Sequence, residues 1–152
     1  MTHLEMTAHF DAPIERVFDL ATEFERYPEW NVTYSEVTEV TGPPDKVGTR
    51  IHSVMQFLGR SMEGWGDIVE VDRPRLLKIA GEGEGGTLTT VHRLTAAETG
   101  TDYVLEVDYE LPAGVFGQAA IKMFVDRAVE RDLRGSIENF QALAEARVPV
   151  LA

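Results

Sequence analysis

The sequence has 152 residues, of which 43% are hydrophobic and 9% aromatic, enough to fold around a substantial apolar core. It carries 14 Lys and Arg residues against 26 Asp and Glu residues, and this formal net charge of −12 disfavours binding to nucleic acid or to an anionic membrane. It contains no cysteine, which excludes disulfides, thiol catalysis and cysteine-ligated metals.

The chain shows no membrane segment and no secretory signal. No apolar run approaches the ~20 residues that span a bilayer, and residues 1–10 lack a basic region followed by an apolar block. No repeat, low-complexity tract or linker divides the sequence. We therefore expect one domain over residues 1–152, a cytoplasmic location and no stable insertion into a membrane.

The first elements expected along the chain are a strand and two short helices. Residues 4–10 alternate between apolar and polar side chains, which is the period of a half-buried strand. Pro13 suits the first turn of a helix, and apolar side chains then recur at helical spacing over residues 14–21. A second short helix is expected over residues 23–27, ended by Pro28.

From Asn31 the period changes to two, and six further strands are expected. Turn-forming residues separate them, and short turns between consecutive strands imply antiparallel pairing. Residues 81–86, rich in Gly and Glu, are expected to form the tip of a hairpin. The expected strands cover residues 31–40, 47–58, 61–71, 76–80, 87–94 and 102–111.

A long amphipathic helix is expected over residues 115–147. Apolar side chains recur there at three- and four-residue steps without an interrupting proline. Such a helix would be ~50 Å long, and the only broad partner for it is the sheet. The order of elements therefore predicts an α+β fold with the helices on one face of an antiparallel sheet.

Strand alternation indicates which side chains face the helix. In residues 102–111 the apolar set must point inward, opposite an acidic set. In residues 61–71 the facing stays open, because a bulge could exchange Gly64 and Gly66 with Trp65. The side chains expected on the inner face are Ile51, Ser53, Met55, Phe57, Leu88, Thr90, His92, Leu94, Tyr103, Leu105, Val107, Tyr109 and Leu111.

An apolar surface with sparse polar groups is typical of a small-molecule pocket. The alternative is a filled core whose polar atoms are bonded internally; a ligand site would need a cavity of about 300 Å3 or more. The early half of the long helix, which mixes bulky and small side chains, is expected to form one wall. The predicted ligand-binding residues are Tyr34, Ser53, Met55, Phe57, Trp65, His92, Leu105, Val107, Tyr109, Phe116, Ala120 and Met123.

His92 is the candidate with the most chemistry, because a buried imidazole can donate, accept or move a proton near neutral pH. If it lay within hydrogen-bond reach of Tyr103 or Tyr109 at a cavity wall, an enzyme would be favoured. If it were a mere core occupant, His92→Phe should leave folding intact. No catalytic residue is assigned.

No metal or cofactor is expected. The four histidines form neither an HxH nor an HExxH pattern, and His52 and His92 are expected on opposite faces of the sheet. The sequence has no GxSxG elbow, no GxGxxG and no Walker motif.

Segments spread along the whole chain resemble the START-like, helix-grip superfamily (SRPBCC), whose members include the polyketide cyclase/dehydratase and lipid-transport group. The resemblance implies a curved antiparallel sheet of about seven strands wrapped around a long C-terminal helix, with two short helices between strands 1 and 2. It is carried by residues 12–18 (APIERVF), 27–31 (YPEWN), 47–50 (VGTR), 71–74 (VDRP), 76–77 (LL), 100–101 (GT) and 137–140 (IENF).

The favoured function is binding, with or without transport, of an apolar or aromatic small molecule or lipid between sheet and helix. The alternative is a polyketide aromatase/cyclase-type enzyme. Those cyclases line their pocket with an arginine-bearing and a tryptophan-rich strand, whereas this chain offers only Trp65 and an outward-facing Arg50. A protein-interaction module would need a basic or exposed apolar patch, which the sequence does not show. Nothing in it indicates an oligomeric state.

Overall fold

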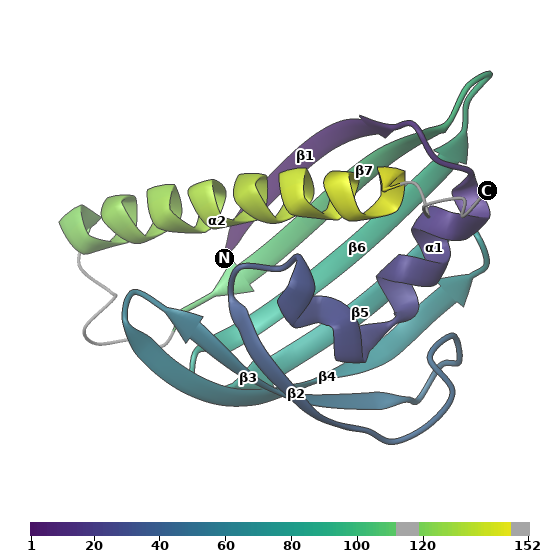
Figure 1. The fold of residues 1–152 in the computed structure, drawn as a ribbon. Helices are drawn as coiled ribbons and strands as arrows, with labels where there is room; N and C mark the ends of the chain where they lie inside the picture. The colour runs from purple at the N-terminus through teal and green to yellow at the C-terminus, as the bar shows by residue number, and fades with distance from the viewer. Residues whose placement is uncertain (112–118, 147–152) are drawn as a thin grey trace.

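A curved seven-stranded antiparallel sheet holds a long C-terminal helix across its inner face (Figure 1). The computed structural model describes residues 1–111 and 119–146. The sheet order is β1-β7-β6-β5-β4-β3-β2, so β2 to β7 follow one another as a meander and β1 closes on β7. The strands are β1 (Thr2–Phe10), β2 (Tyr34–Val40), β3 (Arg50–Phe57), β4 (Arg60–Asp72), β5 (Leu76–Gly83), β6 (Gly86–Ala96) and β7 (Thr101–Glu110).

Three helices complete the described part of the chain. Between β1 and β2 lie α1 (Ile14–Thr22) and the 3₁₀ helix η1 (Phe24–Glu29), and α2 (Ala119–Glu145) follows β7. α2 is 27 residues long, about 40 Å at helical rise. The expected start and end of the long helix, residues 115–118 and 147, lie outside the described residues. The predicted α+β helix-grip architecture is confirmed, and no helix in the described part is long and apolar enough to cross a membrane.

The structure differs from two local expectations. The hairpin tip expected over residues 81–86 lies in that range but is only two residues long, because β5 continues to Gly83 and β6 begins at Gly86, with Gly81 paired to Leu88. Pro28 does not end the second helix but lies inside η1. A short 3₁₀ helix has few i→i−4 bonds for proline to break, so Pro28 is tolerated there.

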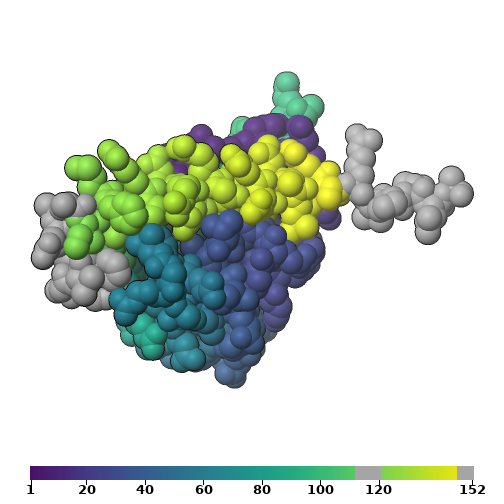
Figure 2. Space-filling view, turned by 60° about the vertical axis from the view of Figure 1, so that its left-hand side comes forward, coloured from purple at the N-terminus to yellow at the C-terminus, as the bar shows by residue number. Residues whose placement is uncertain are grey.

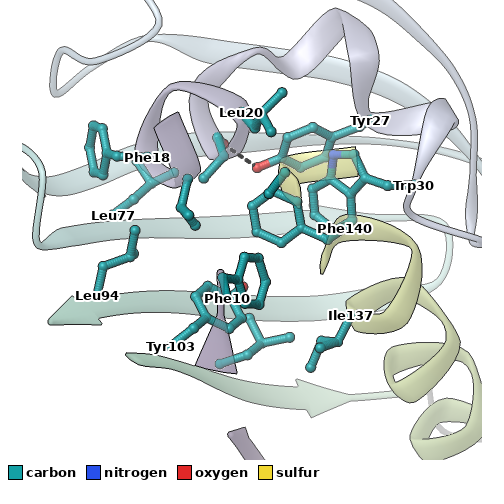
Figure 3. Packing of buried hydrophobic residues seen from close by; sticks show 14 of the residues in the cluster. Phe10, Phe18, Leu20, Tyr27, Trp30, Leu77, Leu94, Tyr103, Ile137 and Phe140 are labelled. Carbon is teal, nitrogen blue, oxygen red and sulfur yellow. Dashed lines mark hydrogen bonds between the residues drawn. The ribbon is translucent and has the colours of Figure 1, made fainter. Parts of the chain in front are cut away.

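The core is concentrated under the C-terminal half of α2. Phe140 is fully buried, and its ring stacks on Trp30 at 4.4 Å and meets Phe10 and Tyr103 at 5.1 and 5.7 Å (Figure 3). This aromatic contact fixes α2 to β1, β7 and the η1–β2 loop. In the space-filling view the outer face of α2 lies open to solvent (Figure 2).

Candidate functional site

Four glycines leave the inner face of β4 and β5 without side chains. They pair across the two strands, Gly64 with Gly83 and Gly66 with Gly81, and we call them the glycine floor. A Cβ on Gly83 would lie 2.5 Å from the backbone oxygen of Glu63 and 2.6 Å from the Cα of Gly64. The strands therefore approach too closely for a side chain at Gly83, whereas a Cβ on Gly64 or Gly81 would make a tight backbone contact of 3.0 or 3.2 Å. The missing side chains leave space beneath α2.

The glycine floor forms one wall of a pocket of about 210 Å3 between the sheet and α2. This volume is below the ~300 Å3 taken above as the minimum for a ligand site, a limit that applies to drug-sized ligands. Val129 and Leu133 of α2 lie on the side opposite the floor, and apolar side chains of the sheet and the loops supply most of the remaining lining. These apolar lining residues include Phe24, Ile51, Met55, Phe57, Met62, Ile79, Leu88, Leu105 and Val107.

The structure gathers most of the predicted site residues around this pocket. Those that line it are Tyr34, Ser53, Met55, Phe57, Trp65, His92, Leu105, Val107 and Tyr109. Their strand faces agree with the alternation in β3, β6 and β7, where the apolar sets are turned inward. A role of these residues in binding stays a prediction.

Trp65 borders the pocket, but its indole ring lies on the other face of the sheet. The β3–β4 register runs without a bulge, so Gly64 and Gly66 face inward opposite Ser53 and Ile51. The Arg50 guanidinium lies over the Trp65 ring, 5.4 Å from its centroid, on the outer face. The facing of this strand, which the sequence left open, therefore has the glycines inward, and a binding role of Trp65 stays a prediction.

Of the three residues predicted to form a wall on the early half of the long helix, Met123 alone has a described side chain. Met123 is 59% exposed and does not line the pocket. Among the described side chains of the helix, those that line the pocket are Val129, Asp132, Leu133 and Ser136. Phe116 lies outside the described residues, and Ala120 is described only as part of the helix backbone. Helical periodicity identifies which face of the helix points toward the sheet. It does not identify which turn of the helix lies over the pocket.

Sequence reasoning missed the glycine floor as a site feature. Its signal was present in Gly64-Trp65-Gly66 and Gly81-Glu82-Gly83, because alternate glycines in a strand share one face. The second triplet is equally typical of a hairpin tip, and the register that joins the two triplets could not be known. Trp30 also lines the pocket without having been predicted there.

His92 and Tyr103 form the buried polar pair of this region. Nδ1 of His92 lies 2.6 Å from the Tyr103 hydroxyl oxygen, and both side chains are almost fully buried. Burial lowers the pKa of His92 to about 4 and raises the pKa of Tyr103. Both groups are therefore neutral at pH 7.

Tyr109 connects the sheet to α2 rather than offering a free hydroxyl. Its hydroxyl donates to Asp126 Oδ1, while Lys122 Nζ donates to Asp126 Oδ2 at 2.7 Å and to Thr2 Oγ1 at 2.8 Å. Burial raises the pKa of Tyr109, and the bond to Asp126 raises it further. Burial acts to raise the pKa of Asp126, but its bonds to Lys122 and Tyr109 prevail and lower it.

The remaining polar groups give the pocket no positive charge. No Lys or Arg is among the described residues that line it, and Asp132 on α2 adds a carboxylate, which Arg131 approaches to 3.3 Å. Burial raises the pKa of Tyr34 to about 12, against the opposing effect of a hydrogen bond with Ser53. The pocket is thus suited to a neutral apolar molecule rather than to an anion.

Trp30 Nε1 is buried without a hydrogen-bond partner in the described part of the chain. The ring of Tyr27 lies 4.7 Å from the Trp30 ring at an interplanar angle of 58°, and Figure 3 shows the indole nitrogen on the side of Tyr27. The indole N–H therefore lies beside an aromatic ring, with no hydrogen-bond acceptor among the described residues.

One group of potential metal ligands occurs among the described residues, on the outer face of β1 and β7. Ligand atoms of His3, Glu5 and Glu106 lie within 4.8 Å of one another. His3 and Glu5 are exposed, and His3 Nδ1 is already within 2.7 Å of Asp108 Oδ1. Exposed acidic clusters of this kind are common without a metal.

Solved structures share this fold at low sequence identity. The Zhui aromatase/cyclase from Streptomyces sp. R1128 aligns with a TM-score of 0.81 and 18% identity over 98% of this chain and 96% of its own. TTHA0849 from Thermus thermophilus aligns with a TM-score of 0.74 and 20% identity over 92% of this chain and 94% of its own. The di-domain ARO/CYC BexL from the BE-7585A biosynthetic pathway aligns with a TM-score of 0.76 and 20% identity. This alignment covers 97% of this chain and 51% of the BexL chain.

These structural similarities show the fold alone, because the sequence identity is too low for an activity to be inferred from them. No curated protein matches the sequence significantly. The family model described as "Polyketide cyclase / dehydrase and lipid transport" matches residues 1–145, almost the whole chain. With a helix-grip sheet, its closing helix and a pocket between them, the chain belongs to the polyketide cyclase/dehydrase and lipid transport family.

Proposed function

We propose that this protein binds a compact, neutral apolar or aromatic molecule between the glycine floor and α2, in the cytoplasm and without catalysing a reaction. The observation that carries the proposal is the side-chain-free patch Gly64, Gly66, Gly81 and Gly83, which leaves an apolar pocket without a cation among its described lining residues. Apolar linings with a few placed polar groups are the usual composition of ligand sites.

The pocket volume supports a ligand of one or two rings. A cavity of roughly 150 Å3 holds benzene, whereas drug-sized ligands occupy about 300–1,000 Å3. At about 210 Å3, the pocket is too small for an extended poly-β-ketone or a whole lipid. Transport of a lipid is therefore less well supported than binding of a small ring molecule.

The His92–Tyr103 pair does not favour an enzyme, although its occurrence was the sign expected of one. General acid–base catalysis works best when the catalytic pKa lies near the working pH. The pKa of His92 is lowered to about 4 and that of Tyr103 is raised, so neither group exchanges protons readily at neutral pH. Tyr103 also does not line the pocket.

Binding can be tested with tetralin, a two-ring hydrocarbon, by calorimetry and thermal shift on the full chain. We expect saturable binding and a higher melting temperature. Thr90→Phe, which places a ring in the pocket, should abolish both effects. Thr89→Phe is the matched control, because Thr89 pairs with Ala80 and Asp108 on the opposite face of β6.

Native mass spectrometry of protein purified from its own host would then give the mass of the natural ligand. If two-ring hydrocarbons and their ketones leave the melting temperature unchanged and no molecule co-purifies, the proposal is refuted.

A further inference from the structure

His92 lines the pocket, and one of its two ring nitrogens is hydrogen-bonded within the protein. Nδ1 lies 2.6 Å from the Tyr103 hydroxyl oxygen, and Nε2 has no hydrogen-bond partner within residues 1–111 and 119–146. Nε2 is nevertheless not enclosed by protein, because Trp30 Nε1 is the single unpaired side-chain atom fully enclosed in that part of the chain. Because His92 lines the pocket, Nε2 is placed to meet a molecule bound there.

The partner of Nδ1 decides which ring nitrogen carries the proton. A neutral imidazole has one N–H donor and one acceptor nitrogen. If Nδ1–H donated to Tyr103, the buried Tyr103 O–H would have no acceptor among the described residues. If instead Tyr103 O–H donates to Nδ1, the proton lies on Nε2, and the one donor left without a protein partner belongs to a residue that lines the pocket, where water or a ligand can accept its hydrogen bond. His92 then presents an N–H donor to the pocket.

The surroundings of His92 restrict what can accept this hydrogen bond. Its cross-strand neighbours on the inner face are Leu77 and Leu105, and no Lys or Arg lines the pocket in the described part of the chain. A carboxylate ligand would lose its hydration without gaining a counter-ion. A hydrocarbon would leave the N–H unpaired. A neutral carbonyl oxygen avoids both costs.

We propose, on the basis of the ligand-binding function above, that His92 Nε2–H donates a hydrogen bond to a neutral acceptor oxygen and selects carbonyl-bearing ring molecules over hydrocarbons of the same shape. Tyr103 is the positioning residue, because it holds the imidazole tautomer without lining the pocket. A site built to donate a hydrogen bond discriminates against the analogue that lacks the acceptor, since the donor is then buried unpaired.

The test compares 1-tetralone with tetralin, which share a two-ring skeleton and differ in one carbonyl. Affinities are measured by calorimetry on the full chain. The wild type should bind 1-tetralone about 2- to 10-fold more tightly than tetralin, the range expected for one hydrogen bond. 1-Naphthoate, an anion of similar size, should bind more weakly than both.

Variants at His92 distinguish the effect of the N–H donor on the preference for 1-tetralone from the effect of the shape of the pocket. His92→Gln keeps an N–H at the position of Nε2 and should retain the preference for 1-tetralone. His92→Phe should bind both probes equally. Tyr103→Phe should reduce the preference for 1-tetralone, because nothing then keeps the proton of His92 on Nε2. His52→Phe is the matched control, because His52 lies on the outer face, opposite Trp65, and it should behave as the wild type.

A spectroscopic measurement keeps the proposal testable if the substituted proteins fold poorly. In the ¹⁵N spectrum of the wild type, His92 should appear as the Nε2-protonated tautomer, and 1-tetralone but not tetralin should move its Nε2–H resonance. An Nδ1-protonated tautomer, or equal affinity for the two probes, would overturn the role of His92 and leave the binding function standing. Absence of binding by either probe overturns the binding function itself.

Discussion

Gly83 of β5 lies directly across from Gly64 of β4, and a Cβ on Gly83 would come within 2.6 Å of the Gly64 Cα. The backbone of β4 leaves no room for a side chain at Gly83, and the four glycines together leave the inner face bare where the pocket lies. The close approach of the two strands at this contact and the position of the pocket are therefore linked.

Alanine at this contact should destabilise the protein. Gly83→Ala would place its methyl group against backbone atoms of β4, which cannot move without breaking the strand pairing. We expect a loss of about 1–3 kcal/mol in the free energy of unfolding, as for other overpacked cores. Urea denaturation measures it.

Gly135 provides the matched control with the opposite sign. It lies inside α2, and a Cβ at this position would have Val32 Cγ1 as its nearest neighbour at 3.9 Å, an ordinary contact. Gly135→Ala should therefore stabilise the protein by about 0.5–1 kcal/mol through helix propensity. Equal effects at Gly83 and Gly135 would contradict the steric account of the glycine floor.

His92→Phe is expected to be costly, in contrast to the sequence-based expectation for a mere core occupant. The substitution removes the partner of the buried Tyr103 hydroxyl, and an unsatisfied buried group costs about 1–3 kcal/mol. The double variant His92→Phe/Tyr103→Phe should recover part of this loss. Chemical denaturation of both single variants and of the double variant gives the coupling energy between His92 and Tyr103. If the losses in the free energy of unfolding were strictly additive, the His92–Tyr103 hydrogen bond would be ruled out.

His92 should also make the fold sensitive to acid. Its pKa is lowered by burial from 6.5 to about 4 in the folded protein, so below pH 6.5 the unfolded chain takes up a proton that the folded chain does not. The contribution of neutral His92 to the free energy of unfolding is complete above pH 6.5. It decreases as the pH falls from 6.5 to about 4. The loss is about 3 kcal/mol over this window. Denaturation between pH 7 and 4 should show it, and His92→Phe should flatten that part of the profile.

Two surface histidines should act in the opposite direction. Hydrogen bonds to Asp108 and Asp102 raise the pKa values of His3 and His9, respectively. Their protonated forms stabilise the folded protein at a pH below 6.5, the pKa of histidine in the unfolded chain. This stabilisation is lost as the pH rises through the pKa values that His3 and His9 have in the folded protein. In the double variant His3→Gln/His9→Gln, stability should therefore depend less on pH above 6.5. A profile unchanged from the wild type would show that solvent screening removes the effect.

Asp126 should control how firmly the first half of α2 is held on the sheet. Its carboxylate accepts from Tyr109 of β7 and from Lys122, which also reaches Thr2 of β1. Asp126→Ala should cost about 1–3 kcal/mol, the range for hydrogen bonds to charged groups. Amide hydrogen exchange should accelerate in α2 near residue 126. Unchanged exchange there would exclude this anchoring role, and Glu138→Ala, at an exposed position of the same helix, is the control.

The sequence was sufficient for the order of elements and for the faces of β3, β6 and β7. Alternation and helical periodicity are local properties, and Tyr103, Leu105 and Val107 follow them strictly. The facing of β4 was not accessible, because whether Trp65 or Gly64 points inward depends on a bulge that only the pairing with β3 reveals.

The sequence by itself determined an acidic, cysteine-free chain that forms an antiparallel sheet and a long amphipathic helix. Only the tertiary structure decided where the pocket lies, because a pocket is what remains after strand register and helix position have been set. Register brings Gly64 opposite Gly83, and the path of α2 places Leu133 rather than Met123 beside the resulting space. These are relationships between residues distant in the chain, and local periodicity carries no information about them.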